Sequence, residues 1–158
     1  MLSEAEERSL LERHFAGDEK ATRAIVEAHE PLVNSVAGRY SKYGPKHEDF
    51  FQEGMVGLIE GLKRFDLEKG VRFSTYARWW IMSKVVEKAR SDYSLIRIGT
   101  TEAQVRLFSS LSSVKRKLGI YSDVLSFDEA KEVAEALNVK IDDVLEMSVR
   151  LSPMAITS

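Results

Sequence analysis

The chain has 158 residues, which is enough for one ordinary domain with a small companion. Its residues are 44% hydrophobic and 30% charged, and there is no cysteine, so disulfides and thiolate metal sites are excluded. No apolar run approaches the roughly 20 residues of a membrane-spanning helix. The acidic, amphipathic N-terminus differs from a secretory signal. We therefore expect a cytoplasmic protein with no membrane partner.

Charge is unevenly distributed along the sequence. Residues 1–62 carry 7 basic and 12 acidic side chains, a net −5, and residues 122–158 carry 3 and 8, also a net −5. Residues 63–121 carry 13 basic and 5 acidic side chains, a net +8. A basic middle between acidic flanks favours a polyanionic partner. The alternative is the ordinary uneven charge of a helical protein.

Every segment of the sequence predicts a helix, so the predicted fold is all-α. Pro31 and Ser74 stand where a helix can begin, and Ser126 with Glu129 forms a capping box. The expected helices cover residues 3–15, 18–29, 31–43, 47–64, 74–91, 100–119, 126–137 and 141–150. We expect a compact helical bundle over residues 1–95, a small three-helix unit over 96–150, and a linker or cut end over 151–158.

The helix expected at residues 47–64 has two different faces. One broad arc is apolar and predicts core, whereas the opposite arc carries Asp49, Gln52, Glu53, Val56 and Glu60 at spacings of three and four. Three glycines lie in the same helix, at positions 54, 57 and 61, each costing about 1 kcal/mol relative to alanine. Gly54 and Gly61 face the core side. The polar arc is either solvated or a docking face for a partner helix that carries arginines.

The helix expected at residues 74–91 holds more aromatic residues than a core needs. Ala77, Ile81 and Val85 form a core stripe with Phe73 beside it, while Tyr76 and both tryptophans lie on or beyond its border. The spacing leaves two interpretations open. The rings pack against the core or another domain, or they stack on nucleic-acid bases with arginines nearby to hold phosphates.

The motifs of these two helices together resemble a known family. DFFQEGMVGLIEGLKRFD (Asp49 to Asp66) and GVRFSTYARWWI (Gly70 to Ile81) resemble the second conserved region of bacterial sigma-70-family transcription initiation factors. Residues 100–119 look like the corresponding stretch of heat-shock-type alternative sigma factors. The resemblance implies a transcription initiation factor, with no enzyme activity, no cofactor and no metal.

The resemblance also implies a protein-docking site. In the family, the acidic face of this helix docks on the clamp coiled coil of the β′ subunit of RNA polymerase core. Asp49, Gln52 and Glu53 match the docking positions, and the apolar Val56 and Ile59 add contact area. The implied polymerase-binding residues are Asp49, Gln52, Glu53, Met55, Val56, Ile59 and Glu60.

The resemblance further implies recognition and melting of the promoter minus-ten element. In the family, an adenine of the nontemplate strand flips out and stacks on the residue matching Tyr76, while Trp79 and Trp80 form a wedge at the duplex edge. Unstacking costs a few kcal/mol per step, and each base–aromatic contact returns about 1–3 kcal/mol. The implied DNA-binding residues are Phe65, Lys69, Arg72, Phe73, Thr75, Tyr76, Trp79, Trp80, Ser83, Lys84, Arg97 and Gln104.

Two other interpretations accompany this one. A helical protein-interaction adaptor without DNA melting would bury the same rings in a domain interface. An enzyme finds little support, because His14, His29 and His47 are scattered and no catalytic motif surrounds them. An anti-sigma factor or chaperone is a further possible partner. Family members continue into a domain that binds the minus-thirty-five element, so we expect the sequence to be a piece of a longer protein or a short member.

Overall fold

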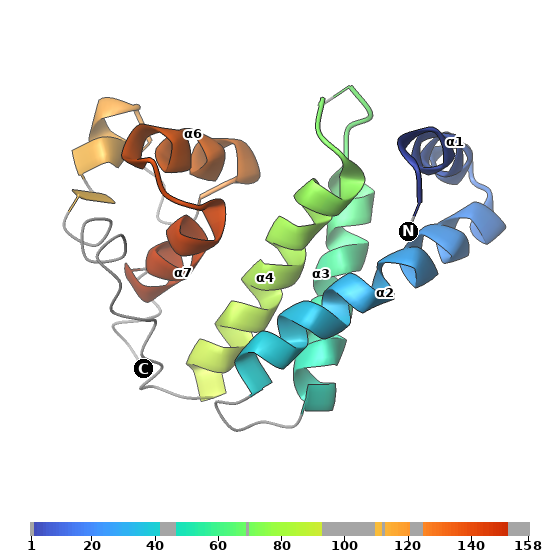
Figure 1. The fold of residues 1–158 in the computed structure, drawn as a ribbon, viewed down its shortest axis with the longest axis horizontal. Coiled ribbons are helices and arrows are strands. Elements are labelled where there is room, and N and C mark those ends of the chain that lie inside the picture. Colours follow the sequence, from blue (N-terminus) through green and yellow to red (C-terminus); the bar gives the residue numbers. More distant parts are fainter. Residues whose placement is uncertain are drawn as a thin grey trace. The chain divides into compact units, whose positions relative to one another are not determined.

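The computed structural model describes residues 2–41, 47–68, 70–92, 110–111, 113–120 and 125–151. These residues contain helices and no strand, which confirms the all-α prediction (Figure 1). None of the described helices is long and apolar enough to cross a membrane. The helices are α1 (Glu4–Phe15), α2 (Glu19–Ser41), α3 (His47–Arg64), α4 (Phe73–Asp92), α6 (Phe127–Leu137) and α7 (Ile141–Leu151).

The chain divides into two compact units, residues 1–85 and 86–158, and α4 contributes to both. The boundary expected between residues 95 and 96 falls outside the described residues and stays a prediction. The same holds for most of the helix expected at 100–119 and for the linker expected at 151–158, of which only residue 151 is described, as the end of α7.

Side-chain caps begin the first two helices. The Ser3 hydroxyl accepts a hydrogen bond from the Glu6 N–H at 3.2 Å, which confirms the start predicted there. Gly17 then takes a φ of 99°, a conformation that side chains disfavour, and ends the turn after α1. The Asp18 carboxylate accepts from the Lys20 and Ala21 N–H groups at 3.0 and 3.3 Å, so α2 begins where the sequence predicted.

The two helices expected at residues 18–29 and 31–43 are one helix, α2, with Pro31 inside it. A proline removes the hydrogen bond that its N–H would have given to the carbonyl four residues earlier. Here that residue is Glu27, and both Glu27 and Pro31 are exposed. Water can therefore replace the missing donor, and the helix continues. Treating Pro31 as a helix start was wrong for this reason.

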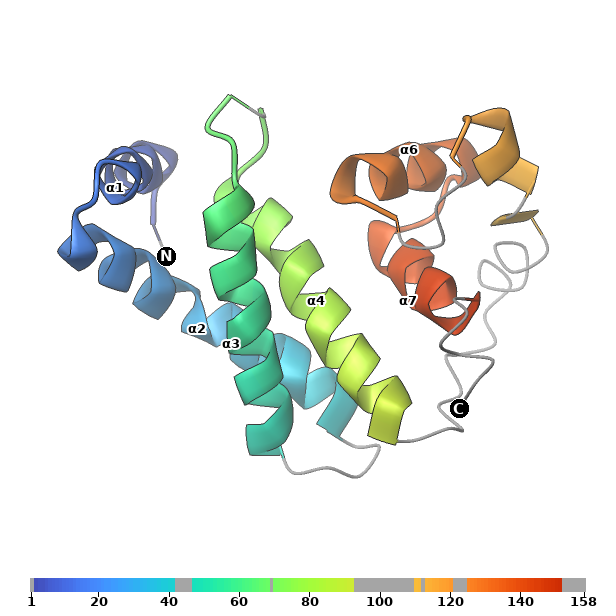
Figure 2. The ribbon, with the colours of Figure 1, turned by 180° about the vertical axis from the view of Figure 1, so that it is seen from behind.

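Glycines bring α3 close to α4 in the first unit (Figures 1 and 2). A Cβ added at Gly57 would lie 2.8 Å from the Trp80 carbonyl carbon and 2.9 Å from the Ile81 Cα. A Cβ at Gly54 would lie 2.7 Å from a Val33 methyl group of α2. The three glycines of α3 therefore serve tight packing, as predicted for Gly54 and Gly61. The tightest of the three, Gly57, was not identified from the sequence.

In the second unit, α6 and α7 pack against each other. Ser126 and Glu129 form the predicted capping box, with both reciprocal hydrogen bonds present at 3.0 and 3.2 Å. Asn138 ends α6 in a left-handed conformation with a φ of 54°. The buried apolar residues of these two helices are Phe127, Ala130, Val133, Ala134, Val144, Leu145 and Met147.

Candidate protein-docking face and aromatic cluster

The outward face of α3 combines exposed apolar and acidic side chains. Val56 is 50% exposed and Ile59 is 43% exposed, two of only four large apolar side chains that stand out in the described part of the chain. Asp49 and Gln52 are exposed two turns and one turn before Val56, and Glu53, Met55 and Glu60 are half-buried. The opposite face of α3 buries Phe50, Leu58 and Leu62. The seven residues implied as a polymerase site thus lie along one accessible side of the helix, and we call this set of seven residues the α3 face.

The acidic residues of the α3 face differ in what they bind. Glu60 forms an ion pair with Arg64 at 3.0 Å, and this hydrogen bond, with the positive charges of Arg64, Lys63 and Lys84, lowers the pKa of the Glu60 carboxyl. Within the described residues, no ion pair engages Asp49 or Glu53. Their carboxylates are therefore available to a cationic partner.

Four aromatic rings contact one another in series within the first unit, and we call them the aromatic cluster. His29 meets Phe73 with ring centroids 4.9 Å apart, Phe73 meets Phe65 at 5.3 Å, and Phe65 meets Tyr76 at 5.5 Å. The His29 Nδ1–H donates to the Ile25 carbonyl at 2.7 Å, which fixes the imidazole. Edge-to-face and tilted pairs of this kind add to the packing energy. The cluster is therefore part of the core.

Burial bears on the two interpretations that the sequence left open for the aromatic residues, packing against the core or stacking on bases. Phe73 is fully buried, and Phe65, Tyr76 and Trp79 are only 7%, 6% and 7% exposed. The burial of Phe73 confirms its place beside the predicted core stripe, and its place among the DNA-contacting residues stays a prediction. Tyr76 and Trp79 offer no open ring face in this structure. Of the two indoles and the phenol, only Trp80 remains half-exposed.

Trp80 lies against the last turn of α3, where Arg64 and Gly61 both contact it. The Arg64 guanidinium carbon lies 5.1 Å from the centroid of the Trp80 ring, a cation–π contact. Gly61, three residues earlier on α3, gives the indole its space, because a Cβ there would lie 3.1 Å from Trp80 Cδ1. The indole Nε1–H is buried and has no hydrogen-bond partner, the one such side-chain atom in the described part of the chain. Leaving a polar group unpaired costs about 1–3 kcal/mol.

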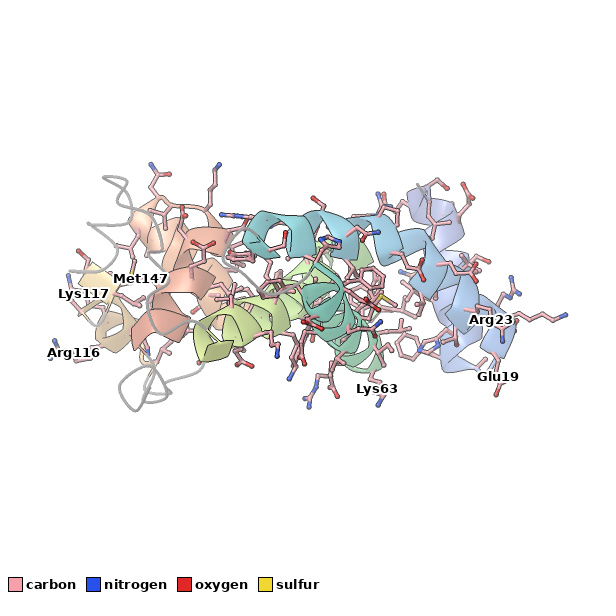
Figure 3. All side chains as sticks on the ribbon, turned by 90° about the horizontal axis from the view of Figure 1, so that it is seen from below. Glu19, Arg23, Lys63, Arg116, Lys117 and Met147 are labelled. Carbon is pink, nitrogen blue, oxygen red and sulfur yellow. The ribbon has the colours of Figure 1, made fainter. Side chains whose placement is uncertain are left out.

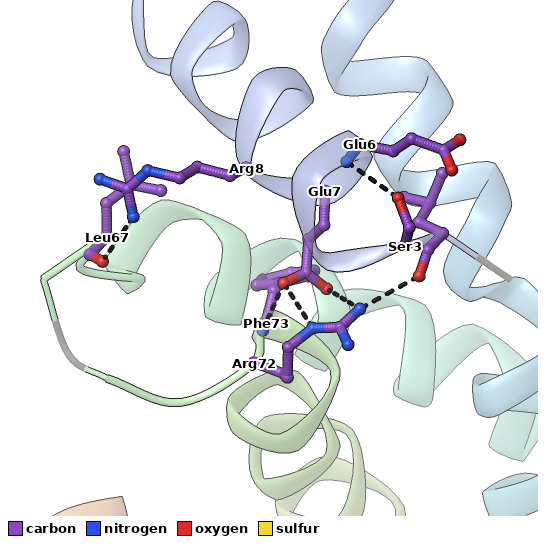
Figure 4. Close-up of polar contacts among 8 residues, drawn as sticks. Ser3, Glu6, Glu7, Arg8, Leu67, Arg72 and Phe73 are labelled. Carbon is purple, nitrogen blue, oxygen red and sulfur yellow. Dashed lines mark hydrogen bonds and ion pairs between the residues drawn. The ribbon is translucent and has the colours of Figure 1, made fainter.

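A buried carboxylate connects α1 to the start of α4 (Figure 4). Glu7 is only 5% exposed, and its Oε2 accepts from Arg72 Nε at 3.1 Å and from the Phe73 N–H at 3.2 Å. Arg72 Nη2 also donates to the Leu2 carbonyl at 3.1 Å, and Glu7 raises the pKa of Arg72. Glu7 thus caps α4 from another helix. Ser74, predicted as the cap, lies inside the helix instead.

The same arrangement gives Arg72 a structural role. Its guanidinium is held by Glu7 and a backbone carbonyl, and its side chain is 40% exposed, so contact with a DNA phosphate stays a prediction. Thr75 is exposed and Lys84 is half-buried, whereas the Ser83 hydroxyl donates to the Trp79 carbonyl at 2.7 Å. The expected DNA contacts Lys69, Arg97 and Gln104 lie outside the described residues. No cluster of His, Asp or Glu suited to a metal occurs among the residues that the structure describes.

Residues 25–93 match the family described as Sigma-70 region 2. This part of the chain is a sigma-70 region 2 domain. It comprises most of α2, all of α3 and α4, and every residue of the α3 face and the aromatic cluster.

Longer proteins resemble nearly the whole chain. The RNA polymerase sigma-C factor of Myxococcus xanthus is 38% identical over 152 residues, covering 96% of this chain and 52% of that protein. The RNA polymerase sigma factors RpoH of Zymomonas mobilis and Rhizobium radiobacter are each 36% identical, covering 93% and 94% of this chain and 50% of each relative. The chain spans about half the length of the curated relatives it matches.

Three residues in or beside the region 2 domain were missed by sequence reasoning. Glu7 had one signal, since it lies four residues before the buried Leu11 and therefore on the same inward side of α1. Gly57 falls on the polar side of a simple helical projection, so nothing marked it as a contact. Arg64 read as an ordinary basic residue in the last turn of α3, and its position over Trp80 depends on tertiary packing.

Proposed function

We propose that this chain acts in bacterial transcription initiation, as the polymerase-docking and minus-ten-recognising part of an alternative sigma factor. The observation that carries the proposal is the α3 face, an accessible apolar pair surrounded by carboxylates on a helix whose back is fixed to α4. The similarity to RpoH proteins supports the alternative class. With RNA polymerase core and promoter DNA as partners, its place of action is the bacterial cytoplasm.

Docking follows from the chemistry of the α3 face. Val56 and Ile59 supply apolar area that is exposed in the isolated chain, and burying such area against a partner is favourable at about 25 cal/mol per Å². Asp49 and Glu53 add negative charge that attracts an arginine-bearing helix and sets its register. The glycine contacts behind α3 keep this surface rigid. These are the requirements for binding the β′ clamp coiled coil.

Strand capture begins at Trp80 in this proposal. Trp80 is the one half-exposed ring among the residues expected to stack, and Lys84 lies one turn beyond it on α4. A stacked base returns about 1–3 kcal/mol, which offsets much of the cost of unstacking it from the duplex. Tyr76 and Trp79 are buried here, so their use as base platforms requires the side chains around them to move when DNA binds.

The second candidate function is the protein-interaction adaptor. The burial of Tyr76 and Trp79 favours it, because rings enclosed by protein have no face for a base. An adaptor would use the α3 face alone and would leave DNA untouched. The two candidates therefore agree on docking and differ on the nucleic acid.

Capture of RNA polymerase core tests the docking step. We expect the triple variant Asp49→Ala, Gln52→Ala, Glu53→Ala to lose capture by at least tenfold, because interface charges of this kind contribute about 1.5 kcal/mol or more when close to their partners. Glu6 and Glu27 are exposed carboxylates elsewhere in the first unit. The double variant Glu6→Ala, Glu27→Ala is the control and keeps capture. Unchanged capture by the triple variant rejects the docking assignment.

Tryptophan emission of the polymerase-bound chain separates the two candidates. A single-stranded oligonucleotide with a minus-ten-like sequence quenches Trp80 if a base stacks on it, and the quenching weakens as salt rises. The Trp80→Phe variant is the control, since it removes the expected reporter. If the oligonucleotide causes no quenching in the polymerase complex even at low salt, the adaptor function is supported instead.

A further inference from the structure

Arg64 occupies the place where a base would meet Trp80. Its guanidinium carbon lies over the indole at 5.1 Å from the ring centroid, and Gly61 leaves room for the edge of the ring at Cδ1. Both a guanidinium and a nucleobase bind an indole through its π face, so they compete for the same surface. In the isolated chain, one face of the half-exposed ring is therefore already occupied by the guanidinium.

Glu60 holds Arg64 in this position. Glu60 lies one helical turn before Arg64 on α3, and its carboxylate accepts a hydrogen bond from Arg64 Nε at 3.0 Å. Glu60 also follows Val56 by one turn and belongs to the α3 face, where its side chain is 33% exposed. A single carboxylate thus borders both the protein-docking surface and the arginine that covers Trp80.

We propose that Glu60 and Arg64 couple polymerase docking to DNA capture: the Glu60–Arg64 pair keeps Trp80 covered in the free chain, and a polymerase cation that binds Glu60 frees Arg64. An incoming cation competes for the carboxylate oxygens and repels the nearby guanidinium. Arg64 then leaves the ring, and a nucleobase takes its place. This inference rests on the proposed function and adds an order of events to it.

The size of the coupling follows from the contacts that hold Arg64. An exposed i,i+4 ion pair and an exposed cation–π contact are each weak, and together they amount to about a three- to tenfold change in an equilibrium constant. Removing the cover should tighten the binding of single-stranded DNA to the free chain by about this factor. An ordinary phosphate-binding arginine predicts the opposite sign, because its removal weakens binding.

The test measures the affinity of the free, full chain for a short A+T-rich single-stranded oligodeoxynucleotide. Arg64→Ala removes the cover and Glu60→Gln releases it. Lys63 is an exposed neighbour on α3 that points away from the ribbon (Figure 3). Lys63→Ala therefore controls for the lost positive charge, and Glu53→Gln controls for the lost negative charge. Circular dichroism confirms that each variant is folded.

We expect Arg64→Ala to bind the oligonucleotide about three- to tenfold more tightly than the unmodified chain, and Glu60→Gln to bind more tightly than Glu53→Gln. Lys63→Ala binds equally or less tightly. Weaker, unchanged or undetectable binding by Arg64→Ala overturns the coupling. Such a result leaves the proposed function intact as long as the α3-face variants still lose polymerase capture.

A second measurement requires no DNA. Acrylamide quenching of tryptophan emission should rise in Arg64→Ala and Glu60→Gln, since the covered face of Trp80 opens, and should stay unchanged in Lys63→Ala. Equal quenching in all of these variants shows that Arg64 does not cover the ring in solution and rejects the inference. Increased quenching without tighter DNA binding rejects it as well, because the uncovered face would then not be used.

Discussion

Gly57 offers the sharpest test of the packing between α3 and α4. A Cβ at this position would lie 2.8 Å from the Trp80 carbonyl carbon and 2.9 Å from the Ile81 Cα. Both are backbone atoms of α4, so no side-chain rotation can make room. The Gly57→Ala variant must instead move one helix away from the other, along the whole contact that Gly54 and Gly61 also form.

The magnitude combines two opposing terms. Overpacking a well-packed contact costs about 1–3 kcal/mol and occasionally more, whereas alanine gains about 1 kcal/mol over glycine as a helix former. Because backbone meets the new methyl group, we place the packing cost at the upper end, which leaves Gly57→Ala less stable by about 2 kcal/mol. For a unit of this size, that lowers the melting temperature by on the order of 10 °C.

Gly38 provides the matched control. It is exposed in α2, and a Cβ there would meet only a His47 ring carbon at 3.8 Å. Gly38→Ala should therefore raise stability by about 0.4–1 kcal/mol. Urea unfolding followed by tryptophan emission reports on the first unit, which contains both tryptophans. Equal stability of Gly57→Ala and the unmodified chain would refute the close approach of the helices.

Three further predictions concern the helix caps. Glu7→Gln should destabilise the first unit by about 1.5–3 kcal/mol in urea unfolding, because charge-assisted hydrogen bonds to Arg72 are lost, while the exposed Glu6→Gln stays within about 0.5 kcal/mol. Hydrogen bonds from Arg13 and the backbone lower the pKa of the Asp18 carboxyl below its ordinary 3.8. Its ionised form therefore stabilises the fold above that pH, and this contribution is lost as the pH falls further. Plots of the free energy of unfolding against pH for Asp18→Asn and for the unmodified chain should therefore converge at low pH. Ser126→Ala should cost about 1 kcal/mol in the thermal unfolding of α6, followed by circular dichroism.

Local signals in the sequence predicted most helices well. The bounds of α3 and α7 and the caps at Ser3, Asp18 and Ser126 depend on residues within a few positions of each other, and all are present. Pro31 failed as a local signal because solvent exposure, which decides whether a helix tolerates proline, depends on the fold around it.

The functional surface was predictable only in part. The α3 face lies on a single helix, so a period of 3.6 residues grouped its acidic residues and Val56 on one side. The same period assigned Ile59 to the core, which its 43% exposure contradicts. The exposure of the aromatic residues depends on which other segments of the chain pack against α4. Spacing within the helix alone could not show that Tyr76 and Trp79 are buried. The pairing of Glu7 with Arg72 spans 65 positions, beyond the range of any periodicity.

That long-range pair limits how the first helix can be exchanged between related proteins. The Glu7 carboxylate completes the hydrogen bonding of α4 and holds the guanidinium beside it. A chimera with a foreign α1 that lacks an acid at this position would leave Arg72 without its ion-pair partner at the start of α4. A chimera with a foreign α4 that lacks the arginine would leave the Glu7 carboxylate buried and unpaired. The two positions should therefore be inherited as a set.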